Sequence, residues 1–423
     1  MSGPAPRTTT TAARAATEGG HEVSADEMLA ARPALWDGGH EFFAWARRMR
    51  AEHPVAHETT TNTWHLFRHE DIRRILSDPS TFSAELDRVM PIETFTRGNI
   101  ATMDPPQHPR MRKLVNQAFT ARTVQDLGER IRAVSDELLG HVERRTEFDL
   151  VSEVTYQLPI IIIAELLGVP AGDRELFRSW VDDMLDPPYD QLTDLLDNEA
   201  VMNARRALDD YLLEKAHQRR REPRQDLISR LVSAEVDGER LADEDVVGFA
   251  SFLLLAGSLT TTVLLGNTMR SLAENPRADL RVREDPALVP QLVEEVLRYR
   301  PSFLPARRVT LHDVVVSGVE IPANSFLTGS IMSANHDEEV FAQPDRFDIH
   351  RTDNPHLAFG HGGHFCLGAP LARLESRTLL EMLFTRMPDL ELAADSTIPI
   401  YGNPDVFGPK RLPVTRGRRG GRV

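Results

Sequence analysis

Residues 359–368 read FGHGGHFCLG and run into a helical pattern that begins at Ala369. This glycine-rich loop holds Cys366, the only cysteine of the chain. A lone thiol cannot form an internal disulfide, and structural zinc sites usually need several Cys or His ligands. What remains is a reactive thiol, a thiolate that ligates heme iron, or a buried inert cysteine beside a turn. The glycines favour the heme ligand, because they let the backbone approach a large flat molecule while its amides hydrogen-bond the sulfur.

The loop resembles the heme-binding signature of the cytochrome P450 monooxygenases, a ten-residue pattern that ends in Cys-x-Gly. The pattern carries over to Phe359, Gly360, Gly362, His364, Cys366 and Gly368. The resemblance implies that Cys366 is the axial ligand of the iron in heme b. A thiolate ligand pushes electron density toward iron and favours cleavage of the O–O bond. Three further family marks follow in the family's chain order, and the similarity extends from about Trp64 to Val414.

A second mark lies in the helical stretch 293–299, where Glu295 and Arg298 stand three apart on one helix face. Taken alone, such a pair is a solvated surface contact of little energy. In the family, the Glu and Arg join a residue of a Pro-x-Arg-Phe segment, matched here by residues 344–347. The resemblance therefore implies that Glu295, Arg298 and Arg346 form a structural ion network behind the heme.

The third mark is the apolar run 250–265, which is interrupted by AGSLTTT at residues 256–262. Small and polar residues are too frequent for a persuasive membrane span, so the run predicts a long buried helix. The Thr260 hydroxyl can bond to a carbonyl one turn back, which bends a helix and opens a groove. In most proteins such a threonine is only a packing residue. In the family the groove admits dioxygen over the iron, and the resemblance implies catalytic roles for Thr260, Ala256, Gly257, Ser258 and Thr261.

The chain departs from the family pattern at Leu259, where an Asp or Glu normally precedes the threonine. A leucine cannot relay a proton or hold a chain of waters. Either water, Ser258, Thr261 or a substrate hydroxyl takes over this role, or the enzyme is slow and releases peroxide.

The fourth mark is MDPPQHPRMR at residues 103–112, a proline-rich entry to a helix that continues to about Phe119. His108 and Arg112 stand four residues apart and face the same way. The family uses this pair, the His before the ligand cysteine and an Arg after the glutamate helix to bind the two heme propionates. The resemblance assigns the latter two positions to His364 and Arg308, and charge-assisted hydrogen bonds would make this pairing strong.

The expected fold class is α+β, mainly α-helical: a cytochrome P450 fold with a long central helix over the heme and a small β region. No repeat or Gly/Ser linker divides the chain, so we expect a single domain over 25–415, with a disordered tail at 1–24 and a flexible tail at 416–423. A strand is predicted at 64–67 and a hairpin at 313–316 and 319–321. Helices are predicted at 70–77, 123–145, 150–167, 171–186, 190–220, 224–235, 242–274 and 287–299.

Composition narrows the class of partner. The net charge of -15 argues against nucleic acid, which requires clustered cations. The N-terminal segment has no apolar core, so neither a membrane anchor nor a secretory signal is expected there. With one cysteine and no signal, a cytoplasmic location is expected. The protein is also expected to be a monomer.

Apolar residues are expected to line the substrate chamber in the segments where the family varies. They suit a large hydrophobic substrate held mainly by shape, although each could equally be ordinary core. Three acids, Asp183, Asp186 and Glu93, could instead meet an amine. The chain resembles soluble bacterial members that tailor polyketides and macrolides. The predicted lining residues are Met90, Ile92, Leu253, Phe303, Leu304, Val406 and Phe407, with a helix break at Pro187 and Pro188.

The resemblance implies a monooxygenase that inserts one oxygen atom from O2 into its substrate, by hydroxylation or epoxidation. No flavin or iron–sulfur motif is visible, so NAD(P)H-derived electrons are expected from a ferredoxin and its ferredoxin reductase. Two alternatives stay open, namely a peroxide-dependent heme-thiolate enzyme and a noncatalytic heme-thiolate sensor. Basic residues expected to steer an acidic ferredoxin are Arg110, Lys113, Arg122, Arg373 and Arg377.

Overall fold

The computed structural model describes residues 23–35, 39–118, 121–185, 187–189, 192–236, 238–394 and 397–417. The described residues extend two positions into each predicted tail. Ser24 is the N-cap of helix α1 (Ala25–Ala30), where it exchanges hydrogen bonds with Glu27 in a capping box. Arg416 ends strand β12 (Pro413–Arg416), and its Nε donates to Asp389 Oδ1 at 2.6 Å. The tails predicted at 1–24 and 416–423 otherwise lie outside the described residues.

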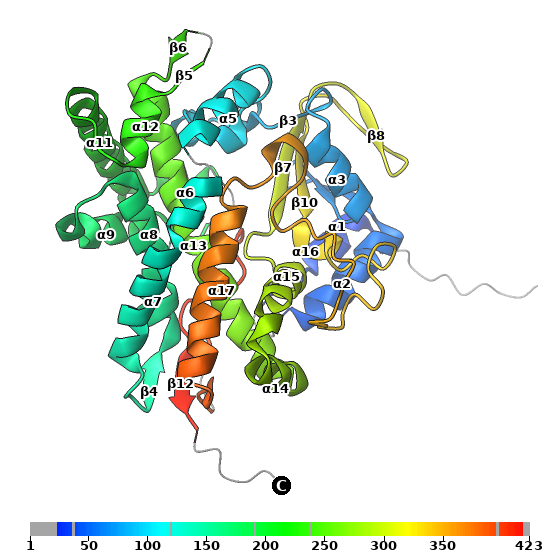
Figure 1. The fold of residues 1–423 in the computed structure, drawn as a ribbon. Helices are drawn as coiled ribbons and strands as arrows, with labels where there is room; N and C mark the ends of the chain where they lie inside the picture. The colour runs from blue at the N-terminus through cyan, green and yellow to red at the C-terminus, as the bar shows by residue number, and fades with distance from the viewer. Residues whose placement is uncertain are drawn as a thin grey trace, which may run out of the picture.

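Helices dominate the described chain and surround one long central helix (Figure 1). Their hydrophobic faces share a large core cluster, which also takes in residues of the N-terminal helices. The helices are α2 (His40–Glu52), α3 (His69–Ser77), α4 (Glu93–Thr96), α5 (Gln107–Ala118), α6 (Ala121–Asp126), α7 (Gly128–Val142), α8 (Gln157–Leu167), α9 (Arg174–Leu185), α10 (Asp194–Asp197), α11 (Glu199–Arg221), α12 (Leu227–Ser233), α13 (Asp243–Glu274), α14 (Pro276–Glu284), α15 (Val289–Tyr299), α16 (Ile331–Ala334) and α17 (Ala369–Arg386).

The central helix is α13, which confirms the prediction over 242–274. It runs behind α17 in Figure 1 and packs against α8, α11, α15 and α17. Among the described residues it is the one helix whose length and composition would also suit a membrane span, but 72% of that stretch is buried inside the protein. The burial marks α13 as a core helix, so its apolar sequence gives no support for a span.

Several predicted helices are broken by local signals that periodicity does not reveal. The stretch predicted at 190–220 is two helices, because Asn198 has extended backbone and its side chain caps α11 by accepting from Ala200 N and Val201 N. The stretch at 150–167 begins with a π-helical turn, Val151–Thr155, before α8. The stretch at 123–145 is divided between α6 and α7.

The β region is larger than the sequence predicts. A five-stranded sheet lies beside α3 on the right of Figure 1 and has the order β1 (Val55–Glu58), β2 (Thr63–Leu66), β10 (Phe326–Ser330), β7 (Pro305–Thr310) and β3 (Phe82–Ser83). Register places Arg308 of β7 opposite Leu327 of β10. A second sheet joins β11 (Leu390–Leu392), β12 and β4 (Glu147–Asp149). The short pair β5 (Glu235–Val236) and β6 (Glu239–Arg240) stands apart from both.

The predicted hairpin is confirmed as β8 (Val314–Val316) and β9 (Val319–Ile321). Its turn places Ser317 at φ 45° and Gly318 at φ 81°. A two-residue turn with positive φ at both positions matches the twist of the flanking strands, and glycine adopts it without steric cost.

Helix α17 contains a buried acid, Glu375, which is 1% exposed and whose Oε1 has no hydrogen-bond partner in the described part of the chain. Burial raises the pKa of this carboxyl from 4.5 to about 8. Between these pH values the folded chain keeps a proton that the unfolded chain releases, so the free energy of unfolding falls as pH rises.

Glu375→Gln should remove this pH dependence, because a neutral amide has no proton to release. We expect similar melting temperatures for the variant and the parent at pH 5. At pH 8 the variant should melt higher by ~5 °C or more. Thermal unfolding followed by circular dichroism measures both, and parallel pH profiles for the two proteins would contradict the assignment.

Candidate active site

The cysteine loop is held in a defined shape between the sheet and α17. The Cys366 N–H donates to the Phe359 carbonyl at 2.8 Å, which closes the loop. Gly360 lies at φ 71°, a left-handed conformation that favours glycine. A Cβ on Gly368 would lie 3.9 Å from Cys366 Sγ, so the backbone passes close beside the sulfur.

The surroundings of Cys366 oppose a free thiolate but suit a metal-bound one. Burial raises the pKa of the thiol, while the N–H groups of Gly368 and Ala369 and then the cations Arg112 and Arg373 act to lower it. A metal at the sulfur displaces the proton outright. In the described part of the chain, no group of three His, Cys, Asp or Glu side chains could hold a metal ion. A single thiol whose sulfur is approached by backbone N–H groups and by two arginines fits the axial thiolate ligand of heme iron.

Basic side chains from three separate segments are gathered near this loop. His108 and His364 lie against one another, with ring centroids 3.9 Å apart. Arg112 Nη2 donates to the Phe365 carbonyl at 2.8 Å. Arg308, from β7, is buried and donates from Nη1 to the Arg307 carbonyl at 2.7 Å.

The electrostatics of this cluster call for an anionic partner. Burial lowers the pKa of Arg308 to about 10. Burial and then Arg308, His108 and Arg112 lower the pKa of His364 to about 3, and burial lowers the pKa of His108 as well. In addition, His108 Nε2 is buried without a hydrogen-bond partner among the described residues. Two carboxylates here would satisfy that nitrogen and compensate the cations, so the four residues fit the propionates of heme.

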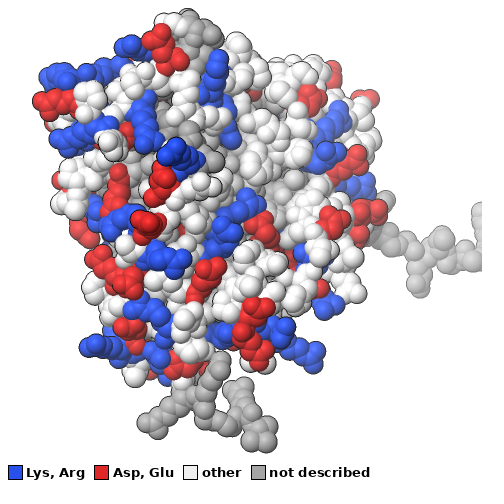
Figure 2. All heavy atoms as spheres, in the orientation of Figure 1, with Lys and Arg blue, Asp and Glu red and all other residues white. Residues whose placement is uncertain are grey.

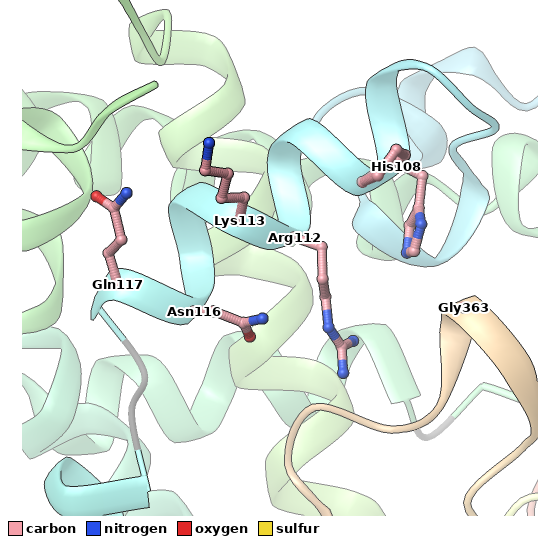
Figure 3. A pocket seen from close by; sticks show the side chains of 7 residues that line it. His108, Arg112, Lys113, Asn116, Gln117 and Gly363 are labelled. Atoms are coloured by element: carbon pink, nitrogen blue, oxygen red, sulfur yellow. The ribbon is translucent and has the colours of Figure 1, made fainter. Parts of the chain in front are cut away.

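A groove of about 510 Å³ separates α5 from the loop that carries Gly363. His108 and Arg112 project from α5 toward that loop, whereas Lys113 projects the other way (Figure 3). The i and i+4 positions of one helix thus share a face, as the sequence predicted. The groove is lined by His108, Pro109, Arg112, Lys113, Asn116, Gln117 and Gly363.

On α13, the Thr260 hydroxyl donates to the Ala256 carbonyl at 2.7 Å, which is the bond predicted from the sequence. The neighbouring residues do not share its position. Ser258 is buried and donates to the Leu254 carbonyl at 2.7 Å, and Thr261 is buried as well. A Cβ on Gly257 would meet Ile163 of α8 at 3.0 Å. Ser258 and Thr261 therefore face packed protein, whereas Gly257 is only partly buried, like Ala256 and Thr260, and its catalytic role stays a prediction.

Leu259 occupies the position where the family normally has an acid, and it is 3% exposed. It belongs to a small apolar cluster with Val263, Tyr401 and Val406, against which Leu185 also packs. The leucine therefore has a packing role that joins α13 to the end of α9 and to the loop after residue 400.

Residues 28–400 match the family model described as Cytochrome P450. The chain is a cytochrome P450. It is 44% identical over 384 residues to "Cyclomarin C epoxidase CymV" of Salinispora arenicola, covering 89% of this chain and 96% of that protein. It is 44% identical over 375 residues to "Erythromycin C-12 hydroxylase" of Saccharopolyspora erythraea, covering 88% and 94%.

Solved structures agree with the family assignment. The ligand-free structure of cytochrome P450 TbtJ1 has a TM-score of 0.85 and 47% identity, with 91% of this chain and all of that chain covered. A mutant of P450 EryK in complex with erythromycin B has a TM-score of 0.85 and 42% identity, with 92% and 100% covered. The protein is therefore a P450 monooxygenase with the expected α+β fold, and its family implies heme.

The ion network of this P450 differs from the sequence prediction in one member. Glu295 and Arg298 are buried and bidentate, with both N–O distances 2.8 Å. The Arg346 side chain is 66% exposed and contributes only its backbone carbonyl, which accepts from Arg298 Nη2 at 3.1 Å. Instead, Arg351 Nε lies 3.3 Å from Glu295 Oε2. Arg346 was thus the wrong third cation, because its segment turns its side chain outward and its carbonyl inward.

A further ion pair links α15 to the cysteine loop of the P450, and the sequence did not predict it. Arg373 binds Glu294 at 2.6 and 2.8 Å, and its guanidinium lies 4.5 Å from the centre of the Phe359 ring. Burial alone would raise the pKa of Glu294, but hydrogen bonds from Arg373 and His356 lower it to about 2. Arg373 therefore helps to hold the loop through this ion pair, and its predicted part in steering a ferredoxin stays a prediction.

The predicted substrate-lining residues of the P450 fall into separate groups. Phe303 forms a β-bridge with Val406, and the Leu304 N–H donates to the Asp405 carbonyl at 2.8 Å, so two distant segments lie side by side. Ile92 and Met90 pack with Leu86 and Val309. Leu253 is 6% exposed and lies in the main core cluster.

Phe407 is a correction to the predicted lining, since its side chain is 0% exposed inside the main core. Hydrophobicity alone could not separate it from its neighbour Val406.

The three acids predicted to meet an amine are described only in part. Asp183 is exposed, Asp186 lies outside the described residues, and the side chain of Glu93 is likewise not described.

Proposed function

We propose that this P450 hydroxylates or epoxidises a large hydrophobic natural product of polyketide or macrolide type. The observation that carries the proposal is the β-bridge between two apolar residues, Phe303 and Val406, of which Val406 also packs with Leu259 of the central helix, and these residues would form an apolar wall of the chamber. Such a wall selects by shape and offers few charges. Relatives named for cyclomarin C epoxidation and erythromycin hydroxylation support the substrate class.

The chain's own residues supply binding, exclusion of water and proton placement. His108, Arg112, His364 and Arg308 would hold the propionates, and Cys366 would ligate the iron. The heme, when bound, supplies the activation of dioxygen. Thr260 holds a proton at Oγ1 and is only partly buried, so it would turn this proton from the Ala256 carbonyl toward oxygen bound beside α13. Leu259 cannot relay a proton, which leaves the proton supply to water or to a substrate hydroxyl.

Electrons are proposed to come from NAD(P)H through a ferredoxin and its ferredoxin reductase. On the face formed by α5, α7 and α17, basic and acidic side chains are interspersed (Figure 2). Lys113, Arg122 and Arg377 are exposed and could attract an acidic ferredoxin, whereas Arg373 is engaged with Glu294. Arg110 is exposed as well. The cytoplasmic location, the single domain over 25–415 and the monomeric state stay predictions of the same proposal.

Turnover assays can test this proposal and separate it from peroxide-dependent chemistry. The heme-loaded protein is offered a panel of macrolides that includes erythromycin, with either NADPH, ferredoxin and reductase or hydrogen peroxide. A macrolide that shifts the spin state should be converted to an oxygenated product in the first mixture. Conversion with peroxide alone would favour the peroxide-dependent alternative, and no conversion in either mixture would favour the sensor.

Thr260→Ala should lower the product formed per NADPH by ~10-fold or more, because the positioned proton at Oγ1 is lost. NADPH consumption should continue and peroxide should accumulate instead. Ser258→Ala is the matched control, since that hydroxyl is bonded to the Leu254 carbonyl inside the core. Equal coupling in the Thr260 variant and the parent would contradict a role for this hydroxyl.

A further inference from the structure

The side chain of Tyr189, which follows α9, is bound to a loop more than 200 residues further along the chain. Its hydroxyl donates to Asp405 Oδ2 at 2.8 Å. Arg307 of β7 donates to the same oxygen from Nη1 at 2.6 Å and also bonds to Oδ1 from Nη2. The Asp405 side chain is 8% exposed and that of Arg307 is 18% exposed. One buried carboxylate thus joins three separate parts of the fold.

Backbone hydrogen bonds hold Asp405 in place independently of Tyr189 and Arg307. Its N–H donates to Asn403 Oδ1 at 2.8 Å, and its carbonyl accepts from Leu304 N at 2.8 Å. The Phe407 N–H donates to the Ser302 carbonyl at 3.2 Å. The carboxylate is therefore a fixed acceptor, and fixed acceptors lose little freedom when a donor binds.

Apolar contacts also join the end of α9 to the loop that carries Asp405, next to the hydrogen bond of Tyr189. Leu185, at the end of α9, packs on the cluster of Leu259, Val263, Tyr401 and Val406. Pro188 lies against the same loop, because a Cβ on Gly402 would be 3.5 Å from Pro188 Cβ. The end of α9 and the residues after it thus meet loop 401–406 through both an apolar cluster and a buried hydrogen bond.

We propose that loop 401–406 is a clasp that holds the end of α9 and Tyr189 against the wall of the substrate chamber. Tyr189 and Asp405 are then positioning residues that set how quickly a bound molecule leaves. Leu259 belongs to the apolar half of the clasp, which accounts for a leucine at a position where the family normally has an acid. The chamber itself rests on the proposed function, while the clasp rests on the contacts of Tyr189 and Leu185.

Tyr189→Phe removes one hydroxyl and leaves the Arg307 ion pair intact, so the fold should survive. Hydrogen exchange, read by mass spectrometry on peptides that cover 187–189, should become at least several-fold faster. In the heme-loaded protein, stopped-flow spectroscopy should show 4-phenylimidazole dissociating ~10-fold faster, as expected for a lost hydrogen bond to a charged group.

Tyr211→Phe is the matched control, because the Tyr211 hydroxyl donates to Asp173 Oδ2 at 2.6 Å near the opposite end of α9. It should change neither readout. Asp405→Glu keeps the charge beside Arg307 and serves as the conservative variant, in which dissociation should stay close to the parent rate or be only partly accelerated.

Unchanged exchange at 187–189 in Tyr189→Phe would overturn the clasp. Faster exchange with unchanged dissociation of 4-phenylimidazole would overturn the positioning role. The exchange measurement needs no heme, so a protein that lacks a thiolate-ligated heme would sink the proposed function and still leave the clasp to be decided.

Discussion

Cys366→Ser is expected to abolish the red-shifted Soret band that a thiolate-ligated heme gives in its reduced carbon monoxide complex. Cys366 is the chain's single cysteine, so no second thiol can replace it. A serine hydroxyl has nearly the same size but keeps its proton far more tightly than a thiol, and it is a poor ligand for this iron. The variant should therefore retain the fold and lose the electronic signature.

His361→Ala is the control for this experiment. His361 lies in the same loop but outside the six positions that the family pattern carries over. This variant should keep the red-shifted band. A parent protein that stays colourless after hemin is added, or that shows the Soret maximum of a histidine-ligated globin, would refute thiolate ligation.

Arg298→Ala is expected to destabilise the fold by about 3–5 kcal/mol, because it leaves Glu295 as a buried charge without its bidentate partner. The loss is large because Arg298 also donates to the carbonyls of Asn335 at 2.9 Å and Pro344 at 2.8 Å. Urea unfolding of the heme-loaded protein measures the free energy, and the Soret absorbance retained after gel filtration measures loss of heme. Both the free energy of unfolding and the retained Soret absorbance should fall, so a separate effect on catalysis could not be measured in this variant.

Arg346→Ala is the informative comparison, because the sequence prediction and the structure disagree about it. An exposed side chain 3.9 Å from Asp348 should contribute no more than about 1 kcal/mol. Arg351→Ala should cost more, since Arg351 lies 3.3 Å from Glu295 and is only 10% exposed. If Arg346→Ala proves as damaging as Arg298→Ala, then the replacement of Arg346 by Arg351 in the network is wrong.

The pair Arg346 and Arg351 shows where reasoning from sequence ends. The Pro-x-Arg-Phe pattern identified the right segment, since the Pro344 and Arg346 carbonyls both accept from Arg298. It could not tell which of two arginines five residues apart turns inward, because no helix or strand periodicity governs this segment. The Thr260 bond was predicted correctly, because the regular geometry of α13 places a carbonyl of the preceding turn within reach of the hydroxyl.

Non-local pairing explains most of what was missed in the fold. Strands β7 and β10 are short, and β10 pairs in parallel with β2 more than 250 residues away. The residues around Phe326 do not indicate which distant strand they pair with. The same limit applies to Val406 and Phe407, adjacent apolar residues of which one packs with Leu259 in a small cluster and the other lies in the main core.

The contacts from Glu294 through Arg373 to Phe359 connect helix α15 to the loop that carries Cys366. Glu294 lies on α15, and the Phe359 carbonyl accepts the N–H of Cys366. A shift of α15 by a fraction of an ångström would thus be transmitted mechanically to the peptide group beside the sulfur. We therefore expect substitutions that move α15 to change the reduction potential of a heme iron bound at Cys366, even where they touch no residue of the loop itself.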